Sequence, residues 1–490
     1  MPTSRQMFIN GQWQDAAATF DVTNPADGSH YASVADADVS DARRAIDAAG
    51  DAAAAWAATP HSQRARLLNK AADVVERRQQ ELAAALVAES GSWIGKAMFE
   101  SGAAANVLRA AAAAAYQVKG EILPSDYGKL SMVIRQPLGV VAVISPWNFP
   151  LLLSTRGIAV AMAVGNTIVL KPSEETPVSG GLLLAECMEE AGIPAGVFNV
   201  VTCSRDHVAK VGEELVANPR VKAVSFTGST AVGRQIGALA GGLLKKACLE
   251  LGGKDAIIVL DDADIGRAVD VATFGCFMHQ GQICMSGERI LVHRDIADEF
   301  TRRFVANVKT LGVGNPAEMG NVIGPIINAK QLAGIESQVR DAEAHGARIE
   351  TGGTYAGLFY SPTVLSGVTP EMRIFREETF GPVAAITVIE NDEQAITLAN
   401  DSEYGLSAGI LTRNEERGLE IARKLETGMA HVNDAPVHDE AIVPFGGMKN
   451  SGLGRHGGTA SIETFTEVRW VTVERGGRHL PPPFLEKAPD

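Results

Sequence analysis

The chain contains little cysteine, no long apolar run and no excess of basic residues. Its 490 residues include five cysteines and no Cys-x-x-Cys pair, so neither a disulfide framework nor a metal site such as zinc is predicted. The longest apolar stretch, 157–170, is interrupted by Gly165 and Asn166 and is shorter than the roughly 18 residues of a membrane span. Lys and Arg number 44 against 58 Asp and Glu, a net charge of −14, which argues against nucleic acid or an anionic membrane as the main partner. The first residues hold no apolar signal segment, so we expect a cytoplasmic protein.

The N-terminal third is rich in alanine and helical in pattern. Residues 8–13 predict a hairpin, because Asn10-Gly11 supplies the positive φ of a two-residue turn. Ala, Leu and Val then recur at helical spacing near 40–58, 61–79 and 97–119.

From residue 131 onward, short β-branched runs alternate with helical stretches. Strands are predicted at 140–144, 167–170, 197–201, 221–226 and 256–260, with helices at 151–164, 177–191, 207–217 and 230–239. This alternation is typical of a parallel sheet covered by helices on both faces. A second series runs from a helix near 264–278 to about residue 445, so we predict an α/β fold with two parallel-sheet domains. Residues 465–474 predict one more strand, isolated from any helix. It would pair with 131–136 in a small two-stranded extension whose exposed edge suits another subunit.

Cys284, in GQICMSGERI, is the first candidate for chemistry. It lies in a loop between a predicted helix and the predicted strand 289–292. A thiolate is a strong nucleophile, and a loop position near a helix N-terminus would increase its fraction. The alternative is an inert buried cysteine, because free cysteines are among the most buried residues.

Two further candidates lie beside predicted strands. Glu250, in CLELGGKDA, ends a short strand, where open α/β sheets place their sites; the alternative is a solvated or salt-bridged acid. Asn148, in ISPWNFP, follows the strand 140–144 and could donate to an oxyanion, although a turn asparagine would look the same.

Three motifs suit a nucleotide. In FTGSTAVG, Gly228 and Ser229 lie between a strand and a helix whose first N–H groups could bind phosphate, or Ser229 is an ordinary helix cap. Lys171 and Glu174, in KPSE, could contact ribose hydroxyls. EETFGP places paired acids before an aromatic residue and a turn.

Together these motifs resemble those of the aldehyde dehydrogenase superfamily. PWNFP, KPSE, FTGST, ELGGK, GQIC, EETFGPV and PFGGMKNSGLGR occur in the family's order and cover nearly the whole chain. The resemblance implies a Rossmann-like NAD-binding domain (1–118 and 138–251), a catalytic domain (252–450) and oligomerisation strands (119–137 and 460–480). It also implies a homodimer or homotetramer.

The resemblance further implies oxidation of an aldehyde to a carboxylic acid with NAD(P)+. Cys284 would be the nucleophile, and the Asn148 amide and Cys284 N–H would hold the oxyanion. Glu250 would activate water for thioester hydrolysis and help to form the thiolate. Because members that pass the acyl group to coenzyme A tend to lack an acid at the position of Glu250, water is the expected acceptor.

For the cofactor, the matching positions imply contacts from eight residues: Trp147, Lys171, Ser173, Glu174, Gly228, Ser229, Glu378 and Phe380. A carboxylate at 174 favours NAD over the 2′-phosphate of NADP, but Lys171 leaves NADP possible.

The substrate is inferred from the C-terminal motifs. HVNDAPVHDEAIVPFGGMKNSGLGRHGG, GQICMSGERI and PLLLSTR are similar to segments of benzaldehyde, vanillin and salicylaldehyde dehydrogenases, so we expect an aromatic aldehyde. The expected pocket residues are Leu152, Arg156, Ile283, Met285 and Phe445. Two alternatives are an aliphatic or semialdehyde substrate, with Arg156 a packed or salt-bridged helix residue, and a non-catalytic binding role.

Overall fold

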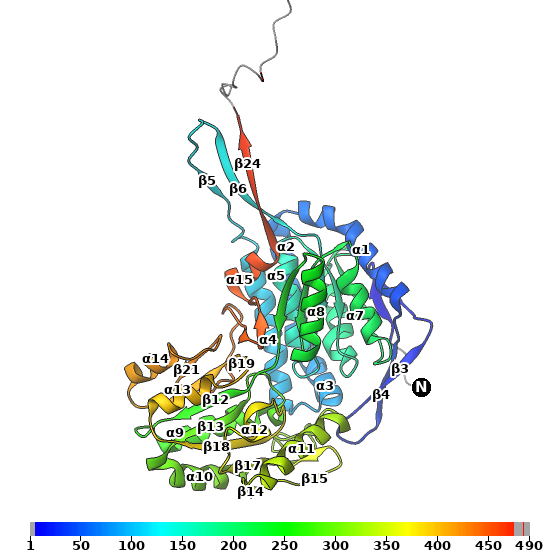
Figure 1. The fold of residues 1–490 in the computed structure, drawn as a ribbon. Coiled ribbons are helices and arrows are strands. Elements are labelled where there is room, and N and C mark those ends of the chain that lie inside the picture. Colours follow the sequence, from blue (N-terminus) through cyan, green and yellow to red (C-terminus); the bar gives the residue numbers. More distant parts are fainter. Residues whose placement is uncertain (1–4, 475–483, 485–490) are drawn as a thin grey trace, which may run out of the picture.

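The computed structural model describes residues 5–474 and Phe484, and it shows two α/β bodies and a projecting β extension (Figure 1). Within these residues, no helix is both long enough and apolar enough to cross a bilayer. The proline run 481–483, for which the sequence predicts a loose tail, lies outside the described residues, as do the last residues of the predicted oligomerisation strands 460–480.

The first body is built on an eight-stranded sheet with the order β2-β1-β9-β8-β7-β10-β11-β23. Its five central strands are parallel, and β2, β1 and β23 join them at the edges in antiparallel pairing. Asn10 and Gly11 have φ of 54° and 72°, the two positive values of a tight hairpin turn. The strands are β1 (Met7–Ile9), β2 (Gln12–Gln14), β7 (Val140–Ile144), β8 (Thr167–Lys171), β9 (Phe198–Val200), β10 (Val221–Thr227), β11 (Lys246–Glu250) and β23 (Gly452–Leu453).

Helices cover both faces of this sheet because alternate strand residues point to opposite sides. Val141 and Val143 pack with α2 to α6, whereas Val140 and Ala142 pack with α1 and α7. The first group is α2 (His61–Arg77), α3 (Gln79–Ser90), α4 (Ile94–Ala114), α5 (Pro150–Ala163) and α6 (Leu183–Ala191), with a π-helical turn, η1 (Val178–Leu182), before α6. The second is α1 (Val39–Ala58), α7 (Val208–Ala217) and α8 (Thr230–Gly242).

The second body holds a seven-stranded sheet with the order β14-β17-β18-β13-β12-β20-β21. All neighbouring strands are parallel except β14 and β17. The strands are β12 (Asp255–Val259), β13 (Gly287–His293), β14 (Arg348–Thr351), β17 (Thr363–Ser366), β18 (Val383–Ile389), β20 (Ala408–Leu411) and β21 (His431–Val432).

Six helices accompany this second sheet. Residues of α9 and α10 share one core cluster, and residues of α11, α13 and α14 share the other. The helices are α9 (Ile265–Phe277), α10 (Arg294–Val308), α11 (Ala329–Ala344), α12 (Arg373–Arg376), α13 (Asp392–Asn400) and α14 (Glu415–Ala422).

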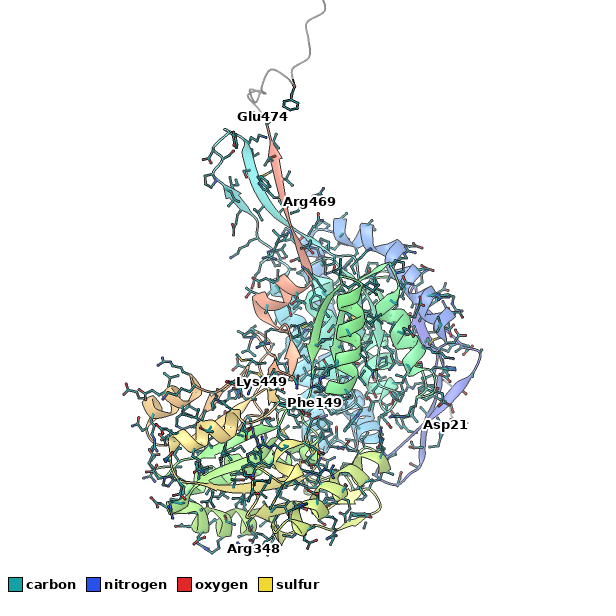
Figure 2. All side chains as sticks on the ribbon, viewed as in Figure 1. Asp21, Phe149, Arg348, Lys449, Arg469 and Glu474 are labelled. Atoms are coloured by element: carbon teal, nitrogen blue, oxygen red, sulfur yellow. The ribbon has the colours of Figure 1, made fainter. Side chains whose placement is uncertain are left out.

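The β extension has three strands in the order β24-β6-β5 and projects from the first body (Figure 1). It consists of β5 (Glu121–Leu123), β6 (Leu130–Pro137) and β24 (Thr466–Val473). Arg469 lies along it, and Glu474 near its tip (Figure 2).

The two-domain α/β class and the pairing of the last strand with 131–136 are confirmed. Two details were wrong: β5 makes the extension three-stranded, and the last strand is not isolated from helices, because α15 (Gly458–Thr464) leads directly into it.

Three small pairs and one short turn complete the fold. The pairs are β3 (Thr19–Thr23) with β4 (His30–Ala35), β15 (Tyr355–Ala356) with β16 (Phe359–Tyr360), and β19 (Tyr404–Gly405) with β22 (Met448–Lys449). The turn, η2 (Met278–Gly281), lies between α9 and β13. It determines where the next loop, which contains Cys284, is placed.

Candidate active site

The three predicted catalytic residues meet where the two bodies face each other. Glu250 ends β11 and Asn148 follows β7, so both come from the carboxyl edge of the first sheet. Cys284 lies in the turn before β13 of the second sheet. The Asn148 Nδ2 donates to the Gln282 carbonyl at 3.0 Å, which ties the two loops together. Phe149, the residue after Asn148, is labelled at this junction (Figure 2).

Cys284 lies between two cavities. One has a volume of about 220 Å³ and is lined by Trp147, Gly228, Ser229, Glu250, Glu378 and Phe380. The other has about 290 Å³ and is lined mainly by apolar and aromatic side chains. Asn148, Leu153 and Cys284 line both cavities. A ligand in either cavity therefore lies beside the same thiol.

A left-handed turn fixes the loop that carries Cys284. His279, Gln280 and Gly281 have φ of 50°, 55° and 67°, values that non-glycine residues rarely adopt. The Gln280 Nε2 holds the turn by donating to the carbonyls of Gly91 (3.1 Å) and Pro325 (2.9 Å). A Cβ at Gly281 would lie 2.1 Å from the Gly381 oxygen, so only glycine fits there. Strain of this kind persists only where the surroundings impose it, commonly at functional sites.

The surroundings of Cys284 disfavour its thiolate form. Burial raises the pKa of Cys284, and the carboxyl groups of Glu250, Asp255 and Glu378 raise it further. The cysteine itself lies in a turn between η2 and β13. Attack at carbon therefore needs a base to remove the thiol proton.

Glu250 is buried with neither carboxyl oxygen hydrogen-bonded to any described residue. Burial raises its pKa well above the usual value, and the positive charges of Arg156 and Arg455 partly oppose this effect. A carboxyl group in such a site is suited to exchange a proton near neutral pH.

Lys96 and Glu100, which sequence reasoning missed, hold Asn148 in place. Both side chains are fully buried on α4 and form an ion pair. The Lys96 Nζ donates to the Asn148 carbonyl at 2.7 Å, and Glu100 accepts from the N–H groups of Leu151 (2.9 Å) and Leu152 (3.2 Å). The available signal was a Lys and a Glu four residues apart within a helix of small, apolar residues.

The smaller cavity has the groups that a dinucleotide needs. Ser229 caps α8 without a side-chain bond to the helix, so the first N–H groups remain available for a phosphate. The rings of Trp147 and Phe380 meet edge to face at 5.3 Å. Glu378 accepts from the Gly253 N–H at 3.0 Å, and burial raises its pKa to about 8. These donors and rings fit a nicotinamide nucleotide.

The structure places the KPSE residues outside that cavity, at the end of β8. The Lys171 Nζ donates to the Pro172 carbonyl at 2.9 Å, and the Ser173 hydroxyl lies 3.5 Å from the Glu174 carboxylate. Arg205, which sequence reasoning missed, pairs with Glu174 at 2.8 Å and with Glu175 at 3.0 Å. The Glu174 carboxylate, which the sequence predicts to favour NAD over NADP, is thus paired with a cation.

All five predicted pocket residues line the larger cavity: Leu152, Arg156, Ile283, Met285 and Phe445. Both interpretations of Arg156 hold, because it lines the cavity and also pairs with Asp439. Its guanidinium lies 4.4 Å from the centre of the Phe445 ring. Sequence reasoning missed Asp439 and the contribution of α4 through Phe99.

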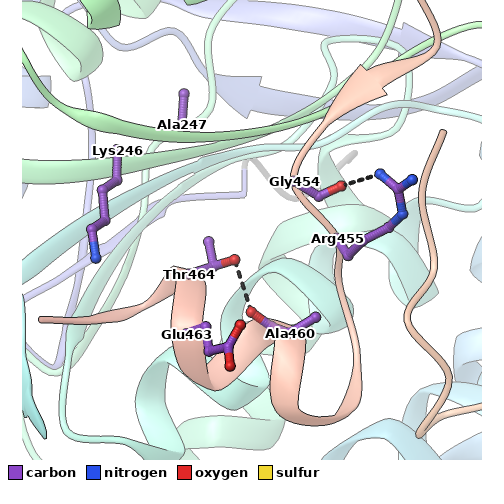
Figure 3. A pocket seen from close by; sticks show the side chains of 7 residues that line it. All are labelled: Lys246, Ala247, Gly454, Arg455, Ala460, Glu463 and Thr464. Atoms are coloured by element: carbon purple, nitrogen blue, oxygen red, sulfur yellow. Dashed lines mark hydrogen bonds between the residues drawn. The ribbon is translucent and has the colours of Figure 1, made fainter. Parts of the chain in front are cut away.

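A third cavity, of about 500 Å³, lies between β11 and α15 and carries none of these groups (Figure 3). Its cations are already engaged: the Arg455 guanidinium donates to the carbonyls of Gly447 and Gly454, each at 2.7 Å, and Lys246 pairs with Glu467 at 3.3 Å. None of the predicted catalytic or cofactor residues lines this cavity.

Known proteins share this arrangement over nearly the whole chain. The model of the "Aldehyde dehydrogenase family" matches residues 13–471. A vanillin dehydrogenase of Pseudomonas fluorescens is 47% identical over 97% of this chain and 99% of its own, and a benzaldehyde dehydrogenase [NAD(+)] of Pseudomonas putida is 44% identical over 95% of each chain. The crystal structure of a salicylaldehyde dehydrogenase from Pseudomonas putida G7, complexed with salicylaldehyde, is 40% identical with a TM-score of 0.96 over 98% of this chain and all of that one. The chain therefore belongs to the aldehyde dehydrogenase family.

Proposed function

We propose that this enzyme oxidises an aromatic aldehyde to the carboxylic acid with NAD(P)+, through a covalent intermediate on Cys284. The observation that carries the proposal is the position of the Cys284 thiol between an apolar cavity and one lined by the predicted cofactor residues Gly228, Ser229 and Glu378. The aromatic class is supported by relatives named vanillin, benzaldehyde and salicylaldehyde dehydrogenases.

In the acylation half, ionised Glu250 takes the thiol proton and the Cys284 sulfur attacks the aldehyde carbon. The oxyanion of the resulting thiohemiacetal accepts from the Asn148 amide and the Cys284 N–H. Asn148 has a donor to spare, because an amide carries two N–H bonds and one is used on Gln282. Within the described residues, the Cys284 N–H has no protein acceptor. NAD(P)+, when bound, accepts the hydride that leaves the thiohemiacetal carbon.

In the deacylation half, the thioester on Cys284 is hydrolysed. Glu250 first releases the thiol proton to solvent and then takes a proton from water, which attacks the thioester carbon. The tetrahedral intermediate collapses to the carboxylic acid and the Cys284 thiolate, which regains a proton from Glu250. The absence of hydrogen bonds from described residues to its carboxylate leaves Glu250 able to face a water molecule. Both halves use Glu250 as the base, so the rates of acylation and deacylation both depend on its pKa.

The cavity supports an aromatic rather than an anionic aliphatic substrate. An anionic semialdehyde needs a free cation near Cys284, but the guanidinium of Arg156 is already paired with Asp439. Phe149 and Phe445 supply flat apolar contacts for a ring.

We also propose the domain limits and location that the sequence indicated. The nucleotide-binding part would comprise 1–118 and 138–251, the catalytic part 252–450, and 119–137 with 460–480 the bridging strands. The return of β23 to the first sheet just after residue 450 supports the limit there. The location is proposed to be cytoplasmic.

The test is the rate of NADH or NADPH formation with benzaldehyde, vanillin, succinic semialdehyde and propanal. We expect the two ring aldehydes to be preferred, and the Cys284→Ala variant to lose turnover while still binding NAD. Retained oxidation by that variant would exclude the mechanism, and preference for the aliphatic compounds would exclude the aromatic assignment.

A further inference from the structure

The larger cavity is apolar except for a few side chains, and most of those are already engaged. Lys96 uses its three donors on Ser92, Glu100 and the Asn148 carbonyl. Asn148 and Cys284 belong to the reaction itself. The remaining buried polar pair is Arg156 and Asp439, whose side chains are 7% and 16% exposed.

This pair leaves one donor and one acceptor unused. The Arg156 Nη2 donates to the Asp439 Oδ2, but the Arg156 Nη1 and the Asp439 Oδ1 are buried with no hydrogen-bond partner among the described residues. Phe445 stacks against the guanidinium and keeps it at the wall of the cavity. Buried polar atoms normally find a partner, so this donor and acceptor point to a polar group on the ligand.

The two atoms match a hydroxyl group. A hydroxyl accepts through its oxygen and donates its hydrogen, so it can take a bond from Arg156 and give one to Asp439. A methoxy group can satisfy Arg156 only, and a carboxylate would be repelled by Asp439. An unsubstituted ring would leave both atoms unpaired. A site that hydrogen-bonds a hydroxyl discriminates against an analogue that lacks it, because its buried polar groups then have no partner.

We propose that Arg156 and Asp439 form a specificity site for a phenolic hydroxyl, so the preferred substrates are ring-hydroxylated aromatic aldehydes. This inference rests on the proposed oxidation of aromatic aldehydes. The pair forms a wall shared with a second cavity of about 590 Å³, which Phe99 and Leu152 also line. Because the second cavity lies beyond this wall, further substituents on the ring have space there.

The experiment compares kcat/KM for hydroxybenzaldehydes with kcat/KM for the matching methoxybenzaldehydes. The two substituents have similar electronic effects on the aldehyde, but only the hydroxyl can donate to Asp439. Wild-type enzyme should prefer at least one hydroxy isomer over its methoxy partner by tenfold or more. A ratio near one for the ortho, meta and para isomers would overturn the proposal.

The decisive variant replaces both members, Arg156→Met with Asp439→Leu, because removing one alone leaves a buried charge unpaired. We expect its hydroxy-to-methoxy ratio to fall to about one. Because Arg156 and Asp439 also shift the pKa of Glu250, kcat/KM should change alike for hydroxy, methoxy and unsubstituted benzaldehydes, so the ratio and not the absolute rate is the readout. The matched control is Arg303→Met with Glu299→Leu, an exposed ion pair on α10, which should leave the ratio unchanged. A double variant in the cavity that keeps the wild-type ratio would overturn the proposal.

If the double variant fails to fold, a measurement on the wild-type enzyme still tests the proposal. Phenol should inhibit benzaldehyde oxidation competitively at a concentration at least tenfold lower than anisole, and equal inhibition would overturn the site. Failure of the proposed function is seen separately, because benzaldehyde itself would then give no NADH or NADPH.

Discussion

At the scale of single residues, Cys284 and Glu250 are both buried groups whose ionised forms the proposed reaction requires. Each must lose a proton to act, and burial raises the pKa of both. The charges of Arg156 and Arg455 lower the pKa of Glu250, while the carboxyl groups near Cys284 raise that of the thiol. These effects agree with the proposed role of Glu250 as the base that removes the thiol proton.

The pH dependence follows from the direction of these shifts. A group with a raised pKa is protonated at low pH and becomes the active base only as the pH rises through that pKa. We therefore expect steady-state kcat to rise with pH from the acid side through neutrality. The Glu250→Gln variant should lose about 10² to 10⁴ in steady-state rate while losing less of the first-turnover NADH burst.

Rapid-mixing and steady-state rates over a pH series measure both effects. The exposed Glu420→Gln variant on α14 is the control and should keep the wild-type profile. Loss of the burst in step with steady-state turnover would mean that acylation, in which Glu250 is also the proposed base, limits the variant. A wild-type steady-state rate would argue against Glu250 as a base.

The choice of cofactor also depends on single charges. Glu174 is paired with Arg205, so removing its carboxylate both ends any ribose contact and frees a cation for a 2′-phosphate. We expect Glu174→Ala to raise the KM for NAD relative to that for NADP, and Arg205→Ala to shift the ratio the other way. Measured KM values for both cofactors test this, and a ratio unchanged in both variants would remove the assigned roles.

At the scale of elements, the α4–α5 contact places the oxyanion site. Glu100 accepts from two N–H groups at the start of α5, which also orients the first turn of that helix. Lys96 holds the preceding carbonyl, so the backbone from Asn148 to Leu152 is fixed from one side by a single helix. The position of Asn148, the proposed oxyanion donor, therefore depends on this buried ion pair.

Breaking that pair should cost both stability and rate. Lys96→Met leaves Glu100 buried without its partner, for which about 3–5 kcal/mol of unfolding free energy is expected. The Lys96→Met/Glu100→Leu double variant should recover part of this stability because it removes both charges. If the pair positions Asn148, both variants should lower kcat more than they raise KM for NAD.

Urea unfolding and initial rates measure the two effects. The control is Lys449→Met with Glu426→Leu, an ion pair whose Lys449 is 27% and Glu426 59% exposed, for which the change in stability should be within about 1 kcal/mol. A stable double variant with wild-type kcat would show that Lys96 and Glu100 do not position Asn148.

The elements also show what the sequence could and could not predict. The central strands were predicted because they are continuous apolar runs, and Glu250 and Asn148 because they directly follow two of them. The left-handed turn before Cys284 was not, because Gln280 depends on carbonyls at Gly91 and Pro325 that are remote in the sequence. The raised pKa of Cys284 was missed for the same reason, since burial comes from both bodies.

At the scale of the whole molecule, the β extension projects away from the two α/β bodies (Figure 1). It carries exposed apolar side chains. Ile122, Val468 and Trp470 are 76%, 51% and 70% exposed. β24 forms the edge of the three-stranded sheet, and an edge that is long and apolar is a template for pairing with another chain. We propose that this sheet joins copies of the chain in a homodimer or homotetramer.

Charge on that surface should separate the copies. Lysines at two positions of β24, Val468→Lys with Trp470→Lys, would place like charges at the contact and remove its apolar area. We expect wild-type enzyme to scatter light as a dimer or tetramer at micromolar concentration, and the double variant to dissociate at concentrations at least tenfold higher than wild type does. Leu419→Lys, a 46% exposed leucine on α14, is the control and should leave the mass unchanged. Because the extension is remote from Cys284, a separated but folded variant should still give the first-turnover NADH burst; a monomeric wild-type enzyme would exclude the proposed assembly.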